Sequence, residues 1–407
     1  MIPVERALEI VLANAPTLPT EEIPLEAALG RVLAEDPRAD VDMPPFDRSA
    51  MDGYALHAAD VTSTPVALDV AGLIRAGQVH DRPLARGQAI QVMTGAPVPA
   101  GADAVQQVEK TRPLDGGRRV EILEPVEAGA NVARQGTEGR VGDQVLSRGE
   151  VVDPAAIAVL AAFGRGRVRV GRRPAVSVVV TGDELVDVWE KPTAGRIRNS
   201  NGYAIAAQAR SAGADVRSLG VVPDREDRIA DALRAGFESD VLVISGGVSE
   251  GVFDLVEKVM SRFDVGVLFD KVAIKPGAPL VFGRRGDKLV FGLPGNPVSA
   301  QVTFDVFVRA ALLRMQGARV VTRPTVEVEL LDPVRNKSGR RAYLPARVRF
   351  EGGRLAARSI RSMGSADVVA HARANALVIL GAERVAAAAG ERAPALLLGS
   401  FLERDGA

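Results

Sequence analysis

The chain has 407 residues, and its 51 basic and 51 acidic side chains give a formal net charge of zero. That balance argues against a general nucleic-acid or membrane-surface binder, because such proteins carry a basic surplus. The absence of cysteine excludes disulfide frameworks, thiolate metal sites and cysteine nucleophiles. His57, His80 and His371 are too far apart in sequence for metal-ligand spacing, so any metal is expected to be a hard cation held by carboxylates.

Targeting and membrane signals are missing from the sequence. The longest apolar runs, such as 155–163, are far below the roughly 18 residues that indicate a membrane span. Glu5, Arg6 and Glu9 interrupt the apolar residues of the N-terminus, unlike the core of a signal peptide. We therefore expect a soluble cytoplasmic protein without a membrane or nucleic-acid partner. A length of 407 residues suggests about two to four domains.

The first 172 residues combine short helices with β-like runs. Apolar spacing predicts a helix over 4–14 and a second short helix over 25–33. Adjacent prolines preclude regular structure within 41–47. From 66 to 126 short β-like runs alternate with Gly or Pro turns, which is typical of a β-rich domain. A helix is expected over 153–163, with Asp at its start and Pro in its first turn.

From residue 173 the pattern changes to apolar strands that alternate with helices. Such alternation predicts a parallel sheet covered on both faces. After residue 323 the helices fade, and short strands predict a small β-barrel or sandwich. The expected strands of the first region are 175–180, 216–222, 240–245 and 289–292, its helices are 203–211, 229–237, 255–263 and 298–315, and the later strands are 325–331, 347–350, 355–360, 376–380 and 395–398.

Polar and glycine-rich segments follow each strand of the predicted parallel sheet, at the edge where such sheets bind ligands. Asp183 and Glu184 follow the first strand, Asp224 follows the second, and glycine-rich turns follow the next two. Backbone amides of such turns cradle oxyanions, and carboxylates can hold Mg²⁺ against phosphate charge. We expect Asn296 to cap the following helix, with Pro297 in its first turn, so that free amides face an anion. Together these features predict a site for a phosphate-bearing ligand and a divalent metal.

Each of these features alone is more often a plain turn or a helix cap than a binding site. The same holds for the Asp-Gly turn at 52–53 and the proline-stiffened loop 94–99. For the segments that follow the strands of the parallel sheet, convergence on one sheet edge favours a functional interpretation.

Six segments in fixed order resemble the MoeA family, the molybdopterin molybdenumtransferases related to the gephyrin E domain. The resemblance covers essentially the whole chain. The segments are 45–55 (PFDRSAMDGYA), 93–99 (MTGAPVP), 181–185 (TGDEL), 245–249 (SGGVS), 273–277 (AIKPG) and 292–299 (GLPGNPVS).

This resemblance implies a multidomain α/β plus β fold. Domain I, elongated and helical, would comprise 1–40 and 137–172, and an inserted β-rich domain II would comprise 41–136. Domain III, over 173–320, would be a MogA-like αβα molybdopterin-binding domain with a central parallel sheet, and a C-terminal β-barrel domain IV would comprise 321–407. The resemblance also implies a homodimer whose active site is shared between subunits.

The activity implied by the resemblance belongs to molybdenum cofactor biosynthesis. The substrates would be molybdate and adenylylated molybdopterin, Mg²⁺ would assist cleavage, and AMP would be released. A MogA-like molybdopterin adenylyltransferase would be the partner that supplies the substrate. No protein cysteine is needed, because the dithiolene sulfurs belong to the pterin.

The family's functional positions map onto this sequence residue by residue. The implied catalytic residues are Asp52, Thr94, Glu184 and Asp254, with Asp52 and Thr94 entering from the partner subunit. Asp224 and Glu184 would hold the metal. The implied substrate-binding residues are Gly246, Gly247, Ser249, Lys271, Lys275, Pro294, Asn296, Pro297, Arg341 and Ser365.

Two positions depart from the family pattern. The usual Arg-x-Gly-Glu-Asp segment reads RQGTE at 134–138, so Glu138 is one methylene longer than the usual Asp, and Ala278 replaces a second lysine. Two other functions remain open: a paralogue that inserts tungstate, and a non-catalytic scaffold of the gephyrin kind. The intact carboxylates at 52, 184, 224 and 254 disfavour the scaffold, which has no need of them.

Overall fold

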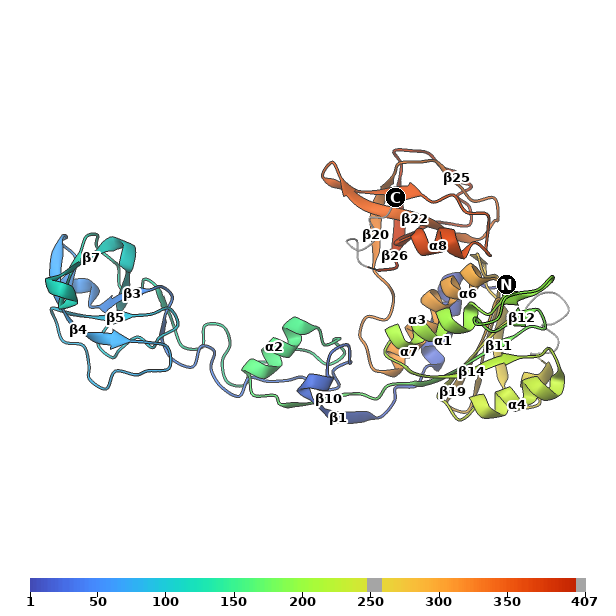
Figure 1. Ribbon diagram of the computed structural model, residues 1–407, viewed down its shortest axis with the longest axis horizontal. Coiled ribbons are helices and arrows are strands. Elements are labelled where there is room, and N and C mark those ends of the chain that lie inside the picture. The colour runs from blue at the N-terminus through green and yellow to red at the C-terminus, as the bar shows by residue number, and fades with distance from the viewer. Residues whose placement is uncertain (247–257, 400–407) are drawn as a thin grey trace. The chain divides into compact units, whose positions relative to one another are not determined.

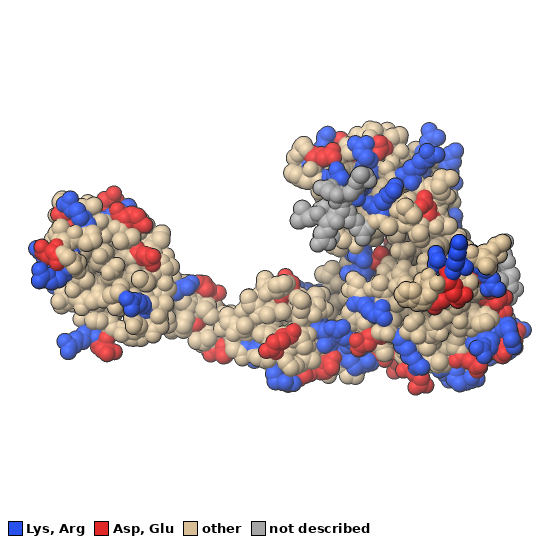
Figure 2. Space-filling model, viewed as in Figure 1, with Lys and Arg blue, Asp and Glu red and all other residues tan. Residues whose placement is uncertain are grey.

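The computed structural model describes residues 1–246 and 258–399 (Figure 1). The chain forms two compact units: unit 1 contains Met1–Glu35, Arg148–Asp153 and Arg167–Ala407, and unit 2 contains Asp36–Ser147 and Pro154–Gly166. None of the described helices is long and apolar enough to cross a membrane. On the face drawn in Figure 2, basic and acidic side chains are interspersed over both units, in keeping with the zero net charge.

Unit 2 is built on a six-stranded sheet in the order β6-β3-β5-β4-β8-β7. Its apolar residues, such as Leu56 and Ile90, alternate into two small cores on the two faces of the sheet. A Cβ on Gly53 would meet the carbonyl oxygen of Gln106 at 2.0 Å, so only glycine allows β3 and β6 to pair there. The elements are β2 (Arg48–Ser49), β3 (Gly53–Leu56), β4 (Val66–Ile74), β5 (Gln88–Val92), β6 (Ala104–Gln107), β7 (Thr111–Leu114), β8 (Arg119–Ile122), β9 (Val132–Ala133) and α2 (Pro154–Ala162).

The centre of unit 1 is a six-stranded sheet in the order β14-β11-β15-β19-β18-β16. The first four strands are parallel, as the alternation of strands and helices predicts, and β18 and β16 extend the sheet in antiparallel fashion. The strands are β11 (Ala175–Thr181), β14 (Asp215–Val222), β15 (Val241–Ser245), β16 (Gly266–Lys271), β18 (Pro279–Arg285) and β19 (Lys288–Leu293).

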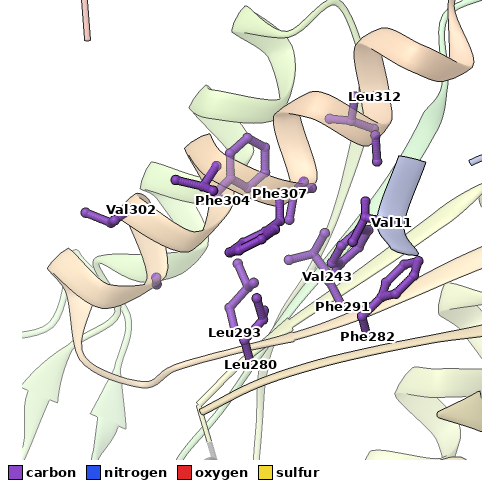
Figure 3. Close-up of a cluster of buried hydrophobic side chains, with 14 of the residues drawn as sticks. Val11, Val243, Leu280, Phe282, Phe291, Leu293, Val302, Phe304, Phe307 and Leu312 are labelled. Carbon is purple, nitrogen blue, oxygen red and sulfur yellow. The ribbon is translucent and has the colours of Figure 1, made fainter. Parts of the chain in front are cut away.

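Helices cover both faces of this sheet (Figure 1). Alternate side chains of each strand reach opposite faces, so Val178 packs with one group of helices and Val179 with the other. The helix predicted over 298–315 is confirmed, although its middle turn is a π-helix. Figure 3 shows its Phe304 and Phe307 facing the strands, with Val11 in the same cluster. One face carries α1 (Val4–Asn14), α3 (Asn201–Ser211), α6 (Pro297–Thr303), η5 (Phe304–Val308) and α7 (Arg309–Met315), and the other carries α4 (Glu226–Gly236).

Two expectations for the N-terminal region differ from the structure. The helix predicted over 25–33 is wrong: only the single 3-10 turn η1 (Leu25–Ala27) forms, because Gly30 at φ +73° stops it and the next residues make β-bridges. The helix expected within domain I, α1, packs instead into the core of the α/β sheet through Val4, Ala7 and Val11. β1 (Thr20–Pro24) and β10 (Arg167–Gly171) form a separate antiparallel pair.

The C-terminal strands close into a barrel. Five strands follow one another in the order β22-β23-β20-β26-β24, and β24 pairs with β22 to complete the ring. Closure leaves none of the five with a free edge along its whole length. The elements are β20 (Thr325–Leu330), β21 (Val334–Arg335), β22 (Arg341–Glu351), β23 (Arg354–Ser359), α8 (Val368–Arg373), β24 (Ala376–Leu380), β25 (Ala386–Ala387) and β26 (Arg392–Leu397).

Several contacts join this barrel to the α/β region, among them a strand pairing and an ion pair. The short strand β17 (Ile274–Lys275) leaves the α/β region and pairs in parallel with β22. In the segment that links the two regions, Arg323 forms a buried 2.7 Å ion pair with Asp305 of η5. Arg323 also donates to the backbone oxygen of Leu398, so one guanidinium holds the helix, the link and the last barrel strand together.

Candidate active site

The carboxyl ends of the parallel strands surround a pocket of about 590 Å³, here called the rim pocket. Its walls come from the loops after β11, β15 and β19 and from the start of α3. This is the sheet edge at which the sequence predicts a ligand site. Among the described residues the rim pocket is lined by Val180, Thr181, Glu184, Leu185, Ile197, Arg198, Asn199, Ser200, Asn201, Gly246, Pro279, Pro294, Gly295, Asn296, Pro297, Ser299 and Ala366.

Close backbone packing shapes the floor of the rim pocket. Gly246 has φ +102°, and a Cβ there would lie 2.1 Å from the carbonyl oxygen of Thr181. A Cβ on Gly295 would lie 3.6 Å from the Cα of Gly246. Gly246 is therefore required where the three segments meet, because any side chain there would push the end of β11 away, whereas a Cβ on Gly295 would make only an ordinary van der Waals contact.

A buried asparagine connects these loops. The Asn201 Nδ2 donates to the Ser245 hydroxyl at 2.9 Å and to the carbonyl oxygen of Gly295 at 2.8 Å. Ser245 in turn donates to the carbonyl oxygen of Pro294 at 3.2 Å. Sequence reasoning missed Asn201 because it lies in no glycine-rich turn. The available signal for its role was a polar residue at the start of a helix that begins beside the end of a strand.

Carboxylates gather at the same edge. The backbone N–H of Asp224 donates to Asp183 at 3.3 Å, and Glu184 lies on the wall of the rim pocket. Burial raises the pKa of Asp224, the nearby Thr181 hydroxyl opposes the rise, and the negative charges of Asp183 and Glu184 add to it. Within the described residues the buried Oδ1 of Asp224 has no partner with hydrogen-bond geometry. A cation beside this oxygen would be stabilised, so the donor set fits Mg²⁺.

The carboxylates do not form a complete metal cage in the structure. In residues 1–246 and 258–399 no group of three or more His, Asp or Glu side chains has metal-binding spacing. Asp254, the remaining predicted carboxylate, and the predicted ligand contacts Gly247 and Ser249 lie outside the described residues.

A second pocket of about 560 Å³ lies between the α/β region and the barrel, and we call it the seam pocket. It shares Pro279, Asn296 and Ser299 with the rim pocket, so the two spaces adjoin. Lys275 and Ser365, both predicted to bind substrate, belong to its wall. Its described lining is Lys275, Pro276, Gly277, Ala278, Pro279, Asn296, Val298, Ser299, Arg340, Tyr343, Leu344, Pro345, Ser362, Gly364, Ser365, Asp367 and His371.

The start of α6 differs from the expectation. The Asn296 side chain does not cap the helix, although Pro297 does occupy its first turn. The amide of Val298 donates to the carbonyl oxygen of Ser365 at 2.9 Å and is not free for an anion. The helix start therefore contributes to the seam mainly by holding the Ser365 loop in place.

Three other predicted residues occupy different surroundings. Arg341 forms an ion pair with Glu5 and lines a separate pocket with it, whereas its neighbour Arg340 lines the seam pocket. The structure does not bring Arg341 together with Ser365, because Arg341 turns toward α1, and its role in substrate binding stays a prediction. Lys271 is exposed at the end of β16 and belongs to neither the rim nor the seam pocket. Ala278, which stands where the family pattern has a second lysine, lies on the wall of the seam pocket. A longer side chain at this position would enter the pocket.

Unit 2 holds the other two predicted catalytic residues side by side. The Asp52 Oδ1 accepts hydrogen bonds from the Thr94 amide at 2.6 Å and from the Thr94 hydroxyl at 2.8 Å. These two bonds lower the pKa of Asp52, so its carboxylate is charged at neutral pH. The pairing joins two motif segments that are more than forty residues apart.

The altered segment 134–138 also packs against the first motif of unit 2. Arg134 pairs with Asp47 at 2.6 Å, and Glu138 pairs with Arg48 at 2.7 Å. The backbone amide of Gln135 and the Arg134 guanidinium lower the pKa of Asp47. Glu138 is thus engaged in a structural ion pair within this motif.

Comparison with known proteins identifies the family. Three family models match in order: "MoeA N-terminal region (domain I and II)" over residues 2–164, "Probable molybdopterin binding domain" over 177–314, and "MoeA C-terminal region (domain IV)" over 327–398. The molybdopterin molybdenumtransferase of Staphylococcus aureus (strain MRSA252) is 34% identical over 384 residues, which cover 93% of this chain and 91% of that protein. The chain belongs to the molybdopterin molybdenumtransferase family.

Other relatives agree with this assignment. The molybdopterin molybdenumtransferase of Bacillus subtilis (strain 168) is 35% identical over 386 residues, covering 93% of this chain and 90% of that protein. The crystal structure of the molybdopterin biosynthesis moeA protein from Pyrococcus horikoshii OT3 superposes with a TM-score of 0.84 at 32% identity. It covers 98% of this chain and all of that chain. The family and the multidomain fold class expected from the motifs are confirmed, while the four domain boundaries stay a prediction.

Proposed function

We propose that this molybdopterin molybdenumtransferase family member inserts molybdenum from molybdate into adenylylated molybdopterin with release of AMP. One observation carries the proposal: the rim and seam pockets adjoin through shared residues. A phosphate-bearing pterin in the rim pocket would therefore lie next to a small oxyanion in the seam pocket.

The seam pocket supplies the chemistry for molybdate. Lys275 and Arg340 are its cationic side chains among the described residues, and Ser362 and Ser365 add hydroxyl donors. A compact ammonium and hydroxyl groups suit a tetrahedral oxyanion. We assign the oxyanion to this pocket, with Lys275 as its principal charge partner.

The rim pocket supplies the groups for phosphoanhydride cleavage. A water oxygen attacks the adenylyl phosphorus, the anhydride oxygen leaves with the molybdopterin phosphate, and the proton of the water passes to a base. Glu184 is our choice for that base, because its carboxylate lines the pocket and has no hydrogen bond among the described residues. Gly246 and Gly295 allow the ligand to approach the backbone closely.

The metal proposed for this site is Mg²⁺. Asp224 would hold it through the buried Oδ1 that lacks a partner, with Glu184 as the second carboxylate. Mg²⁺ would neutralise charge that develops on the phosphate oxygens during cleavage.

Unit 2 would complete the site from a second copy of the chain. The Asp52–Thr94 pair is exposed and charged, so it is available to a neighbouring subunit. We therefore propose a homodimer with two shared sites. A MogA-like molybdopterin adenylyltransferase, as the preceding enzyme, would supply the adenylylated substrate.

The test is AMP release from adenylylated molybdopterin in the presence of Mg²⁺. Chromatography measures the AMP that is released. Molybdate should trigger release of one AMP per molybdenum inserted, and Glu184→Gln should slow it strongly. A chain that retains molybdopterin but releases no AMP is a scaffold, and that result overturns the proposal. A parallel assay with tungstate tests the paralogue: release with tungstate alone overturns the assignment of molybdate.

A further inference from the structure

Arg198 is the only cationic side chain among the described residues that line the rim pocket, and Glu184 is the only anionic one. Neither the sequence motifs nor the predicted ligand contacts include Arg198. It lies in β13 (Ile197–Arg198), which pairs in parallel with β12 (Leu185–Val186) at the pocket mouth. The position of a single arginine in an otherwise uncharged or acidic pocket requires a physical explanation.

Local hydrogen bonds hold Arg198 by one end of its guanidinium. Its Nε donates to the carbonyl oxygen of Glu190 at 2.9 Å. The turn that carries this oxygen is itself closed, because the Glu190 amide donates to the Asp187 carbonyl oxygen at 3.1 Å. In the described part of the chain Arg198 forms no ion pair with a carboxylate, Glu184 included. The two Nη groups therefore remain for a ligand.

The charges on this rim favour a second cation, beside the proposed Mg²⁺, for a phosphate ligand. Asp183, Glu184 and Asp224 lie at the same edge, and each repels a phosphoanhydride. Lys275, the cation expected to hold the ligand's anionic groups, lines the seam pocket instead. An arginine fork suits phosphate better than an ammonium because it offers two parallel N–H donors.

We propose that Arg198 binds a phosphate group of the adenylylated ligand through its two Nη groups, with the Glu190 carbonyl oxygen fixing the fork. The inference rests on the proposed function, since it names the contact that holds the anhydride in the rim pocket. It also separates the two anions: the phosphates belong to Arg198 and the molybdate to Lys275. The competing interpretation is a solvated arginine that only supports its own turn.

The chain provides a built-in probe for this test. Trp189 is the single tryptophan of the sequence, its side chain is 89% exposed, and it precedes the residue that anchors Arg198. Its fluorescence therefore reports on the Asp187–Glu190 turn. ADP serves as a probe with a phosphoanhydride bond, AMP as a probe with one phosphate, and molybdate as the probe of the other pocket. Each is titrated into the full chain with Mg²⁺, and calorimetry gives the same dissociation constants independently.

The variants are Arg198→Ala, Arg198→Lys and the control Arg210→Ala. Arg210 is exposed in the last turn of α3. The first residue of α3 lines the rim pocket, so the control removes the same charge from a position at the opposite end of that helix. Arg198→Ala should weaken ADP binding at least tenfold, and Arg198→Lys should recover only part of the loss. Arg210→Ala should match the wild type, and molybdate affinity should be unchanged in all variants.

The outcomes separate this inference from the proposed function. If AMP loses affinity as much as ADP, the fork holds the adenylyl phosphate; if only ADP does, it holds the neighbouring phosphate. Equal ADP affinity in Arg198→Ala and wild type, with AMP release still triggered by molybdate, overturns the role of Arg198 and leaves the function intact. A wild type that binds ADP through Arg198 but releases no AMP overturns the function instead.

Discussion

The same side chain, aspartate, has opposite properties at two positions of this protein. Asp224 is partly buried beside two other acidic residues, and these surroundings raise its pKa. Asp52 is exposed and accepts two hydrogen bonds from Thr94, which lower its pKa. The environment therefore prepares Asp224 to receive a cation and Asp52 to remain a fixed negative charge.

The raised pKa of Asp224 predicts a pH-dependent stability. The folded state keeps the proton to higher pH than the unfolded state, so stability falls as pH rises from the ordinary value of 3.8 through the folded pKa and is then constant. Asp224→Asn removes this loss. Its thermal midpoint should equal or exceed that of the wild type at neutral pH, with a difference that narrows in acid.

Magnesium provides the control for this prediction. Mg²⁺ should raise the thermal midpoint of the wild type but not of Asp224→Asn, and AMP release should fall in the variant. Two results contradict the assignment of Asp224 as a metal ligand. One is the same Mg²⁺ response in both proteins, and the other is a thermal midpoint of the variant at neutral pH that lies well below that of the wild type.

Replacement of Thr94 tests the pair in unit 2. Thr94→Val keeps the shape and the backbone amide but removes the hydroxyl that donates to Asp52 at 2.8 Å. The pKa of Asp52 should rise toward its ordinary value, which NMR titration of its carboxyl carbon would detect. AMP release should fall on the order of tenfold, the factor for about 1.4 kcal/mol of lost positioning. Unchanged release with an altered pKa would show that the pair has no part in turnover.

Individual functional residues were the hardest feature to predict from sequence. Glycine-rich turns are visible because their residue types are unusual, whereas Arg198 and Asn201 are ordinary residues whose roles arise only when four segments meet. The interpretation of Asn296 as a cap was wrong for a related reason. The amide that it was expected to leave free is satisfied by Ser365, nearly seventy residues away.

At the scale of elements, loops from separate strands form one surface because their backbones touch. The Asn201 amide binds the end of β15 and the loop after β19 at once, and Gly246 lies against the end of β11. Movement of one loop therefore alters the walls formed by the others.

Gly246→Ala tests this coupling. The added Cβ would lie 2.1 Å from the Thr181 carbonyl oxygen at a φ that disfavours any side chain, so the unfolding free energy should fall by about 2 kcal/mol or more. ADP binding should weaken with it. Gly266→Ala is the control, because its nearest atom is 3.8 Å away and the change should stay within about 0.5 kcal/mol. Urea unfolding of both variants measures the difference, and equal stabilities would contradict the required close approach.

Elements with strong periodicity were predictable, and those that depend on tertiary pairing were not. The strands β11, β15 and β19 are mainly apolar because they are buried on both faces, so their sequences reveal them. β22 extends over Arg341–Glu351, but only 347–350 was predicted, because Pro345 interrupts the strand pattern of its first half. Barrel closure maintains that half through pairing with β24.

At the scale of the whole molecule, the proposed dimer divides each active site between two chains. Asp52 lies in unit 2 and Glu184 in unit 1, so the two residues can belong to different subunits of one site. Asp52→Asn and Glu184→Gln should each be nearly inactive alone. In a mixed dimer of the two variants, one site carries both substitutions and the other carries neither.

Mixing therefore predicts recovery of activity. After subunit exchange at equal concentrations, half of the dimers are mixed and each has one intact site, which gives about a quarter of wild-type AMP release. Sedimentation equilibrium of the wild type should show a dimer at micromolar concentration. A mixture that stays inactive although exchange is complete, or a monomer across that range, contradicts the shared site.

The parallel pairing of β17 with β22 gives the barrel an influence on chemistry beyond its own residues. Lys275 is encoded with the α/β region, but its backbone pairs with the barrel at Ala342. An amino-acid change that shifts this barrel strand should also move the lysine, so the proposed affinity for the oxyanion would depend on both segments. Exchange of the C-terminal barrel between homologues should therefore transfer anion preference, even when the segment that contains the lysine is not exchanged.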